Sequence, residues 1–277
     1  MLIKCPLNDT AVTVDDCLEC GAKCLHGNLP LHLARLSKER PVITDQWSVT
    51  QITSPLQITV LKERNAMVVD PMDGVFATWG TAWHKMVEGY STVGNGRYIA
   101  EDYFEGAIET PLGHITLTGT PDLYDKELQT LWDYKTTKAY SMGKAWKSNE
   151  EWFWQLNLYR FWHFPEAKRM FICGAIRDYG WQTKERDGLD PITIKEVPIY
   201  DDKVVLDYTV THLTVLKRCQ DEGIDPPECT DADRWMNYDK RKNKKVYMRC
   251  ERYCAVADVC PQWQGELNEE TQVVQAA

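Results

Sequence analysis

Short apolar runs separated by polar turns dominate the middle of the chain. In residues 119–136, two such runs flank a polar turn at Asp125-Lys126-Glu127. This spacing predicts a β-hairpin, in which side chains two residues apart project from the same face. Further apolar runs at 170–176 and 194–200 predict two more strands.

Apolar residues at helical spacing predict four helices before, between and after these strands. The helices are expected at 48–65, at 80–88, at 150–162 and, with Asp201 as its cap, at 201–219. Alternating helices and strands predict one α/β core. Pro226-Pro227 marks its end, since proline interrupts regular structure.

Composition places the chain among globular proteins. Its 277 residues are 43% hydrophobic and include eleven tryptophans and thirteen tyrosines. No run approaches the twenty or so apolar residues that a membrane span needs. The first residues, Met-Leu-Ile-Lys-Cys-Pro, lack the regions of a signal peptide. We therefore expect a cytoplasmic protein without a membrane partner.

The net charge of −9 counts mildly against nucleic-acid binding. DNA contact nevertheless needs only a local basic surface. The run from Lys240 to Arg249 offers one, with Lys62 and Arg64 as further candidates. A solvated loop is the alternative interpretation of that run.

Candidate chemistry gathers on the predicted hairpin. Asp133 and Lys135 lie two residues apart and share one face, and pairing of the two strands would bring Asp122 close to them. Two carboxylates and a lysine held together cost stability unless a ligand balances them. A divalent cation such as Mg²⁺ does so, because it prefers hard oxygen ligands.

Two helices on either side of the hairpin carry further candidates. His84 and Glu88 lie four residues apart and share one helix face, and Gln155 and Tyr159 do the same. Each pair alone is more often structural than functional. A buried amide beside an aromatic residue, or a lone helical histidine, is common in ordinary cores.

Taken in order, these residues resemble the PD-(D/E)XK nuclease superfamily, whose motif reads Pro121-Asp122 and Asp133-Tyr134-Lys135 here. In its RecB-type branch, a Gly-x-x-x-His helix precedes the motif and a Gln-x-x-x-Tyr signature follows it. Both occur, at His84 and at Gln155 with Tyr159. The resemblance covers residues 75–180.

The resemblance implies a restriction-endonuclease-like α/β core, a central mixed sheet flanked by helices, with metal-dependent nuclease activity. It implies that Mg²⁺ or Mn²⁺ is held by His84, Asp122, Asp133 and the Tyr134 carbonyl. Lys135 would assist the attacking water, and Gln155 and Tyr159 would position the lysine, the metal shell or the DNA backbone.

The amino-terminal cysteines predict a zinc site. Cys5, Cys17, Cys20 and Cys24 stand close together in a segment with few apolar residues, and four thiolates suit tetrahedral zinc. His26 is an alternative to Cys24. The other interpretation is a flexible leader with reduced cysteines, since clustered cysteines in a cytoplasmic protein do not form a disulfide framework.

A second cluster, Cys250, Cys254 and Cys260, resembles the carboxy-terminal triplet of iron–sulfur RecB-type nucleases. Its first gap is three residues where the family usually has two. The family's earlier cysteine is also missing, with Ser54 near its expected place. Cys229 is the natural fourth ligand, and an amino-terminal cysteine is the alternative. Thiolates suit a [4Fe-4S] cluster or zinc equally.

Cys173 and Cys219 remain as expected core residues. We therefore expect four segments: a cysteine-rich zinc-binding leader, a nuclease core, a cysteine-rich metal-binding tail and a disordered end. These segments are 1–30, 45–225, 226–264 and 265–277.

The expected function is DNA hydrolysis, first of all exonucleolytic, on linear duplex ends or single strands. A structure-selective endonuclease is an alternative on the same residues, and a non-catalytic zinc or iron–sulfur nucleic-acid-binding protein is another. The resemblance extends to phage recombination and CRISPR-adaptation nucleases, which implies a host cytoplasm and a recombination or annealing partner. No subunit interface or cleavage polarity is evident.

Overall fold

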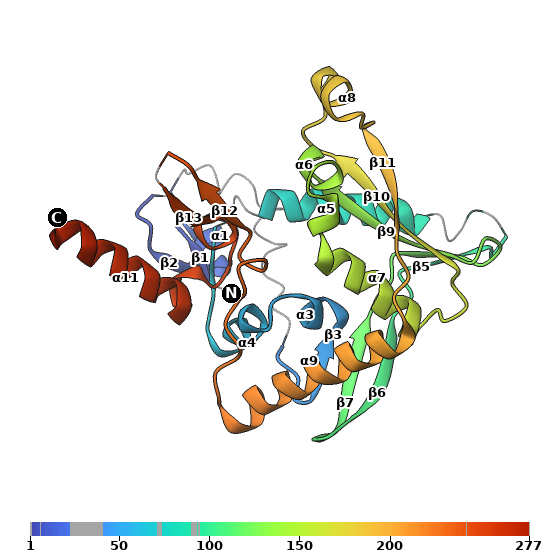
Figure 1. The fold of residues 1–277 in the computed structure, drawn as a ribbon, viewed down its shortest axis with the longest axis horizontal. Coiled ribbons are helices and arrows are strands. Elements are labelled where there is room, and N and C mark those ends of the chain that lie inside the picture. Colours follow the sequence, from blue (N-terminus) through green and yellow to red (C-terminus); the bar gives the residue numbers. More distant parts are fainter. Residues whose placement is uncertain are drawn as a thin grey trace. The chain divides into compact units, whose positions relative to one another are not determined.

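The structure is a computed structural model that describes residues 2–5, 7–22, 41–70, 74–89, 93, 95–241 and 243–276. The chain divides into two compact units (Figure 1). The first unit comprises Met1–Thr44, Ser54–Pro71 and Thr214–Ala277, and the second comprises Asp45–Thr53 and Met72–Leu213.

The second unit is built on a five-stranded sheet in the order β11-β10-β9-β8-β5. Only β9 and β10 run parallel, so the sheet is mixed. A three-stranded sheet has the order β3-β7-β6. The strands are β3 (Gln46–Ser48), β5 (Tyr98–Ala100), β6 (Phe104–Thr110), β7 (Gly113–Gly119), β8 (Leu123–Asp125), β9 (Thr130–Thr137), β10 (Arg169–Ile176) and β11 (Ile192–Val197).

Helices α5 and α7 of the second unit pack against β9. The parallel strands β9 and β10 are joined through α6, η3 and α7, the kind of crossover that parallel pairing requires. The helices are α3 (Val49–Thr53), α5 (Gly74–Glu88), α6 (Ala139–Met142), η3 (Trp146–Ser148), α7 (Glu150–Trp162), α8 (Trp181–Asp187) and α9 (Asp202–Glu222), which continues into the first unit.

This mixed α/β arrangement confirms the predicted fold class. The expected hairpin forms as β8 and β9, with Leu123 opposite Trp132. Strand β11 begins and ends two to three residues earlier than the sequence suggested. Its end at Val197 has a clear cause, because Pro198 lacks the N–H that would continue the ladder.

The helix expected at 48–65 is two helices, α3 and α4 (Leu56–Arg64). Pro55 stands at the amino-terminal cap of α4, and a proline there cannot continue the hydrogen bonds of the preceding turn. The predicted cap of α9 is confirmed, because the Lys203 N–H donates to Asp201 Oδ1 at 2.9 Å.

The first unit has a sheet of order β2-β1-β4 and a separate hairpin of β12 and β13. One buried cluster joins Ile3, Val14 and Cys17, and another includes Ile58, Val256 and Cys260. Its elements are β1 (Leu2–Lys4), β2 (Ala11–Thr13), α1 (Val14–Glu19), α4, β4 (Val68–Val69), β12 (Met236–Asp239), β13 (Lys244–Tyr247), α10 (Met248–Arg252), η4 (Ala257–Val259) and α11 (Pro261–Ala276).

Helix α11 includes residues 265–276, for which the sequence predicted a disordered end. Across the described residues, none of the helices has both the length and the apolar character needed to cross a bilayer.

Candidate active and metal centres

The β8–β9 pairing sets two carboxylates against each other. Leu123 lies opposite Trp132, and the same register one residue further places Asp122 opposite Asp133. Both are buried, at 5% and 1% exposure. The Tyr134 N–H donates to Asp122 Oδ2 at 2.6 Å, which fixes the orientation of that carboxylate.

A chain of hydrogen bonds leads from this pair to helix α7. Lys135 Nζ donates to Asp133 Oδ1 at 2.8 Å and to Gln155 Oε1 at 3.1 Å. Gln155 Nε2 donates to the Tyr159 hydroxyl at 3.2 Å. The helical spacing of Gln155 and Tyr159 thus lets one helix face hold the lysine through Gln155, which Tyr159 supports in turn.

Gly119 gives Tyr159 the room it needs. A Cβ added at Gly119 would lie 2.7 Å from the Tyr159 ring and 2.5 Å from the ring of Phe104. These two rings meet edge to face, with centroids 6.2 Å apart. The glycine that begins the Gly-Thr-Pro-Asp segment therefore serves close packing behind the site.

A second group lies on the other side of Asp122. His84 Nδ1, from α5, is 3.2 Å from Asp122 Oδ1 and 3.3 Å from Glu101 Oε1. Among the described residues, only these three side chains bring three potential ligand atoms within 4.8 Å of one another. Glu88, the other candidate on α5, is exposed and outside this group.

Sequence reasoning missed Glu101. It directly follows β5, and its N–H donates to the Asp122 carbonyl at 3.1 Å. Its φ of 49° lies in the left-handed region, where non-glycine residues are strained and often functional. The only sequence signal was an acidic residue after the apolar run 98–100, because the β5–β8 pairing is not encoded locally.

The negative charge of this group attracts a proton when no metal is bound. Hydrogen bonds to Asp122 and Glu101 raise the pKa of His84 to about 10. Burial, together with the nearby Asp122, raises the pKa of Asp133 to about 6, although Lys135 opposes the shift. Asp133 Oδ2 is buried without a hydrogen-bond partner among the described residues.

These residues fit a hard divalent cation. Burial alone would lower the pKa of Lys135, but Asp133 and Asp122 outweigh it and raise that pKa. Lys135 is therefore an ammonium that donates hydrogen bonds. The carboxylates, the unpartnered oxygen of Asp133 and an imidazole are the donors that Mg²⁺ or Mn²⁺ accepts.

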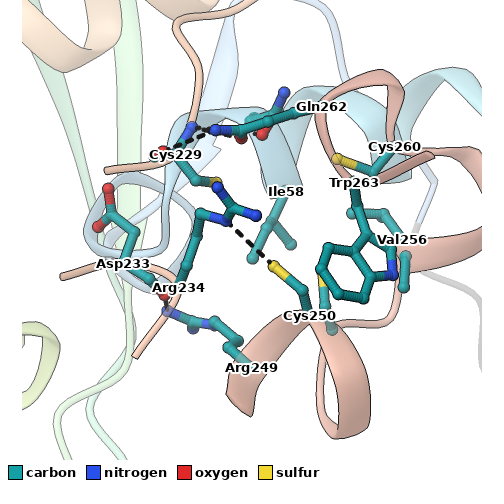
Figure 2. Close-up of a pocket in the computed structure, with 13 residues that line it drawn as sticks. Ile58, Cys229, Asp233, Arg234, Arg249, Cys250, Val256, Cys260, Gln262 and Trp263 are labelled. Atoms are coloured by element: carbon teal, nitrogen blue, oxygen red, sulfur yellow. Dashed lines mark hydrogen bonds between the residues drawn. The ribbon is translucent and has the colours of Figure 1, made fainter. Parts of the chain in front are cut away.

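Four cysteines of the first unit line one cavity (Figure 2). Cys229, Cys250, Cys254 and Cys260 surround a free volume of about 10 Å³. The side-chain amide of Gln262 fixes Cys229, accepting from its N–H and donating to its carbonyl, both at 3.0 Å. The tertiary structure thus brings the predicted fourth cysteine to the triplet.

The donor set suits a thiolate-bound metal, although the sulfur atoms lie further apart than tetrahedral zinc requires. No three of them lie within 4.8 Å of one another. Burial raises the pKa of Cys229 to about 12 and also raises that of Cys254, so both are neutral thiols without metal.

The amino-terminal cysteines are only partly described. Cys5 is half-buried, Cys17 is buried and Cys20 is exposed, and none of the three forms a disulfide with another described cysteine. Cys24 and His26 lie outside the described residues. The zinc site predicted here therefore stays a prediction.

Two basic residues expected to form a DNA-binding surface make contacts within the first unit instead. Lys245 pairs with Asp231 at 2.7 Å. Arg64 donates to the carbonyls of Cys219 and Ile224 at 2.7 and 2.6 Å, near the carboxy-terminal end of α9. These contacts stabilise turns, which leaves fewer of the predicted cations for a ligand.

Comparison with known proteins bears out the family resemblance of the sequence. The family model of the PD-(D/E)XK nuclease superfamily matches residues 22–261. A solved structure described as "Crystal structure of SSO0001" has a similar fold, with a TM-score of 0.53 and 15% sequence identity. The similarity covers 87% of this chain and 98% of that one and concerns the fold alone. No curated protein matches.

Proposed function

The chain belongs to the PD-(D/E)XK nuclease superfamily, and from this premise we propose that it is a Mg²⁺- or Mn²⁺-dependent deoxyribonuclease of the RecB type. The observation that carries the proposal is the buried Asp122–Asp133 pair, which has Lys135 beside it and one unpartnered carboxylate oxygen. A protein that had lost catalysis would gain stability by replacing three such charges.

His84, Glu101, Asp122 and Asp133 would hold the metal, with the Tyr134 carbonyl as a further ligand. When bound, the ion supplies polarisation of the scissile phosphate and a lowered pKa for coordinated water. The ordered contacts from Tyr134 N–H to Asp122, and from Asp122 to His84, keep these donors in place before substrate arrives.

Lys135 would hold the attacking water and offset the negative charge that develops on the phosphate. Its ammonium already donates to Asp133 and Gln155, so it needs little reorganisation. In the absence of metal, Asp133 and Asp122 raise the pKa of Lys135, so its ammonium is a hydrogen-bond donor. Tyr159, whose pKa burial raises to about 12, stays a neutral hydroxyl and positions Gln155.

We further propose that the substrate is DNA and that cleavage starts from ends. The 277 residues carry the nuclease motif, and no Gly-Lys-Ser/Thr phosphate loop occurs among them. A recombination or annealing protein is the partner that such an exonuclease, phage-encoded or not, would serve in the cytoplasm.

The cysteine sites have structural roles in this proposal. Cys229, Cys250, Cys254 and Cys260 would bind an iron–sulfur cluster or zinc, and the amino-terminal four would bind zinc. The colour of the protein distinguishes the two possibilities at the carboxy-terminal cysteines. Brown protein after anaerobic purification indicates iron–sulfur, and colourless protein containing zinc indicates a zinc site.

The nuclease proposal is tested with end-labelled linear and closed circular DNA, with Mn²⁺ or with chelator. We expect chelator-sensitive loss of the linear form alone. Asp133→Asn and Lys135→Met should each lower the rate about 10²-fold or more, with an unchanged circular dichroism spectrum. Cleavage of circles would indicate an endonuclease, and undiminished activity of both variants would refute the site.

A further inference from the structure

A pair of exposed aromatic residues lies on the helix that carries His84. Phe76 and Trp79 are each 50% exposed, and their rings meet edge to face with centroids 5.7 Å apart. Phe76, Gly80 and His84 follow one another at intervals of four residues, so they share a face of α5. Phe76 stands about 12 Å from His84 along the helix axis.

Arg177 joins this pair from the sheet. Its guanidinium carbon lies 4.4 Å from the centroid of the Phe76 ring. Its backbone N–H donates to the carbonyl of Thr137, the last residue of β9, at 2.8 Å. Gly80 of α5 also faces β9, since a Cβ there would lie 3.7 Å from Thr136 Oγ1. Helix and arginine are thus both anchored to the strand that carries Lys135.

Two side-chain donors, one on Arg177 and one on α5, have no acceptor in the part of the chain that the structure describes. Arg177 Nε and Trp83 Nε1 are buried and lack a hydrogen-bond partner among the described residues. Trp83 lies four residues from Trp79 and so belongs to the same helix face. The Arg177 guanidinium is thus placed by its contact with the Phe76 ring, and among the described residues no acceptor holds its Nε.

A second arginine–aromatic pair in the same sheet differs from the Arg177–Phe76 pair in having a carboxylate partner. Arg169, at the start of β10, lies 4.6 Å from the centroid of the Phe171 ring. Its guanidinium makes two hydrogen bonds to Glu196, at 2.8 and 3.2 Å. The charge of Arg169 is thus already matched by a carboxylate, whereas Arg177 Nε has no such partner.

We propose that Phe76, Trp79 and Arg177 form a stacking platform for single-stranded DNA on its way to the catalytic centre. Exposed aromatic rings stack on unpaired bases, and a guanidinium binds phosphate. A duplex offers no free base faces away from its ends. The distance from Phe76 to His84 corresponds to a few nucleotides of strand.

This inference rests on the proposed nuclease function and names its substrate as a single strand. Binding is measured by fluorescence anisotropy without added divalent metal, using labelled dT12, an abasic strand of equal length, and a 12-base-pair duplex. Phe76→Leu should weaken dT12 binding about 5- to 100-fold and leave the abasic strand unaffected. Phe76→Tyr should restore it.

Arg177→Met should weaken binding of dT12 and of the abasic strand alike and reduce the salt dependence by about one ion. The matched controls Phe171→Leu and Arg169→Met should bind as the parent does. Unchanged dT12 affinity in Phe76→Leu, or an equal loss for the duplex, overturns the platform.

The two proposals fail separately. A protein that cleaves DNA but binds dT12 independently of Phe76 overturns only the platform. A protein whose dT12 binding depends on Phe76, yet which never cleaves with any metal, overturns only the nuclease function.

Discussion

The balance of charge among His84, Glu101 and Asp122 determines whether this group holds a proton or a metal ion. Asp122 and Glu101 hold the His84 imidazole between them, and this raises the pKa of His84 to about 10. Metal and proton compete for the same atoms, since a ligating histidine must be neutral. Glu101, which adopts a strained backbone conformation to reach this place, is expected to contribute directly to metal affinity.

Replacing Glu101 by glutamine removes one negative charge and keeps the shape. We expect the Mn²⁺ concentration for half-maximal cleavage to rise about tenfold or more, with kcat at saturating metal changed less. Glu109→Gln is the matched control, because Glu109 also pairs with a histidine, His114, but at an exposed site. An equal shift in both variants would contradict a metal-binding role for Glu101.

Gly119 tests how tightly the site is packed. In Gly119→Ala, the new methyl group would overlap the rings of Tyr159 and Phe104. We expect a loss of about 1–3 kcal/mol in the free energy of unfolding, measured in urea, and a lower kcat because Gln155 loses its support. Gly106→Ala, where a Cβ meets nothing closer than 4.0 Å, should leave kcat unchanged.

At the scale of elements, the edge strand β5 depends on one ion pair. Arg97 Nε donates to Asp125 Oδ1 at 2.9 Å, where Tyr98 pairs with Asp125 across β5 and β8. This contact holds the strand that ends at Glu101. The hydrogen bond from Arg97 lowers the pKa of Asp125 below its ordinary value.

The lowered pKa of Asp125 determines how the stability supplied by the Arg97–Asp125 pair depends on pH. A carboxylate with a lowered pKa stabilises the fold above its unfolded-state pKa of about 3.9, and this stabilisation is lost as pH falls through the folded-state value. Asp125→Asn should therefore lower the urea midpoint at pH 7, and the difference from the parent should shrink below about pH 4. Glu196→Gln, which breaks an exposed arginine pair, should have little effect. A pH-independent difference would contradict this account.

At the scale of the whole molecule, the first unit is held together by segments from both ends of the chain. Its four-cysteine cavity includes Cys229, which Gln262 of α11 fixes by two hydrogen bonds. A metal bound by these cysteines would link the loop before β12 to α10 and to the residue that precedes α11. Its free energy of binding would then add to the folding free energy of the unit.

Gln262→Ala should therefore reduce the iron or zinc content of purified protein, because Cys229 loses its position. Elemental analysis together with the absorbance spectrum measures this. Gln264→Ala is the control, since the Gln264 amide donates to the Ala257 carbonyl instead. Full metal content in Gln262→Ala, with loss in Cys250→Ser, would show that Gln262 is not needed to position Cys229, whose N–H also donates to Gln57.

Much of the site was predictable because its residues lie within regular local structure. Asp133 and Lys135 share a strand face, and Gln155 and Tyr159 share a helix face, so spacing alone groups them. The hairpin turn adds Asp122. Glu101 was not predictable, since it reaches the site through pairing of an edge strand. The break at Pro55 was visible in the sequence, yet the apolar pattern around it favoured one continuous helix.

Local sequence patterns were enough to predict the order of the motifs, the mixed α/β class and the family, because periodicity and short spacing are local properties. The folded structure was needed to show that Glu101 joins His84 and Asp122, that Cys229 faces the cysteine triplet, and that Arg177 contacts Phe76. Each of these contacts joins segments from different elements. They depend on strand register and packing, which no local pattern encodes.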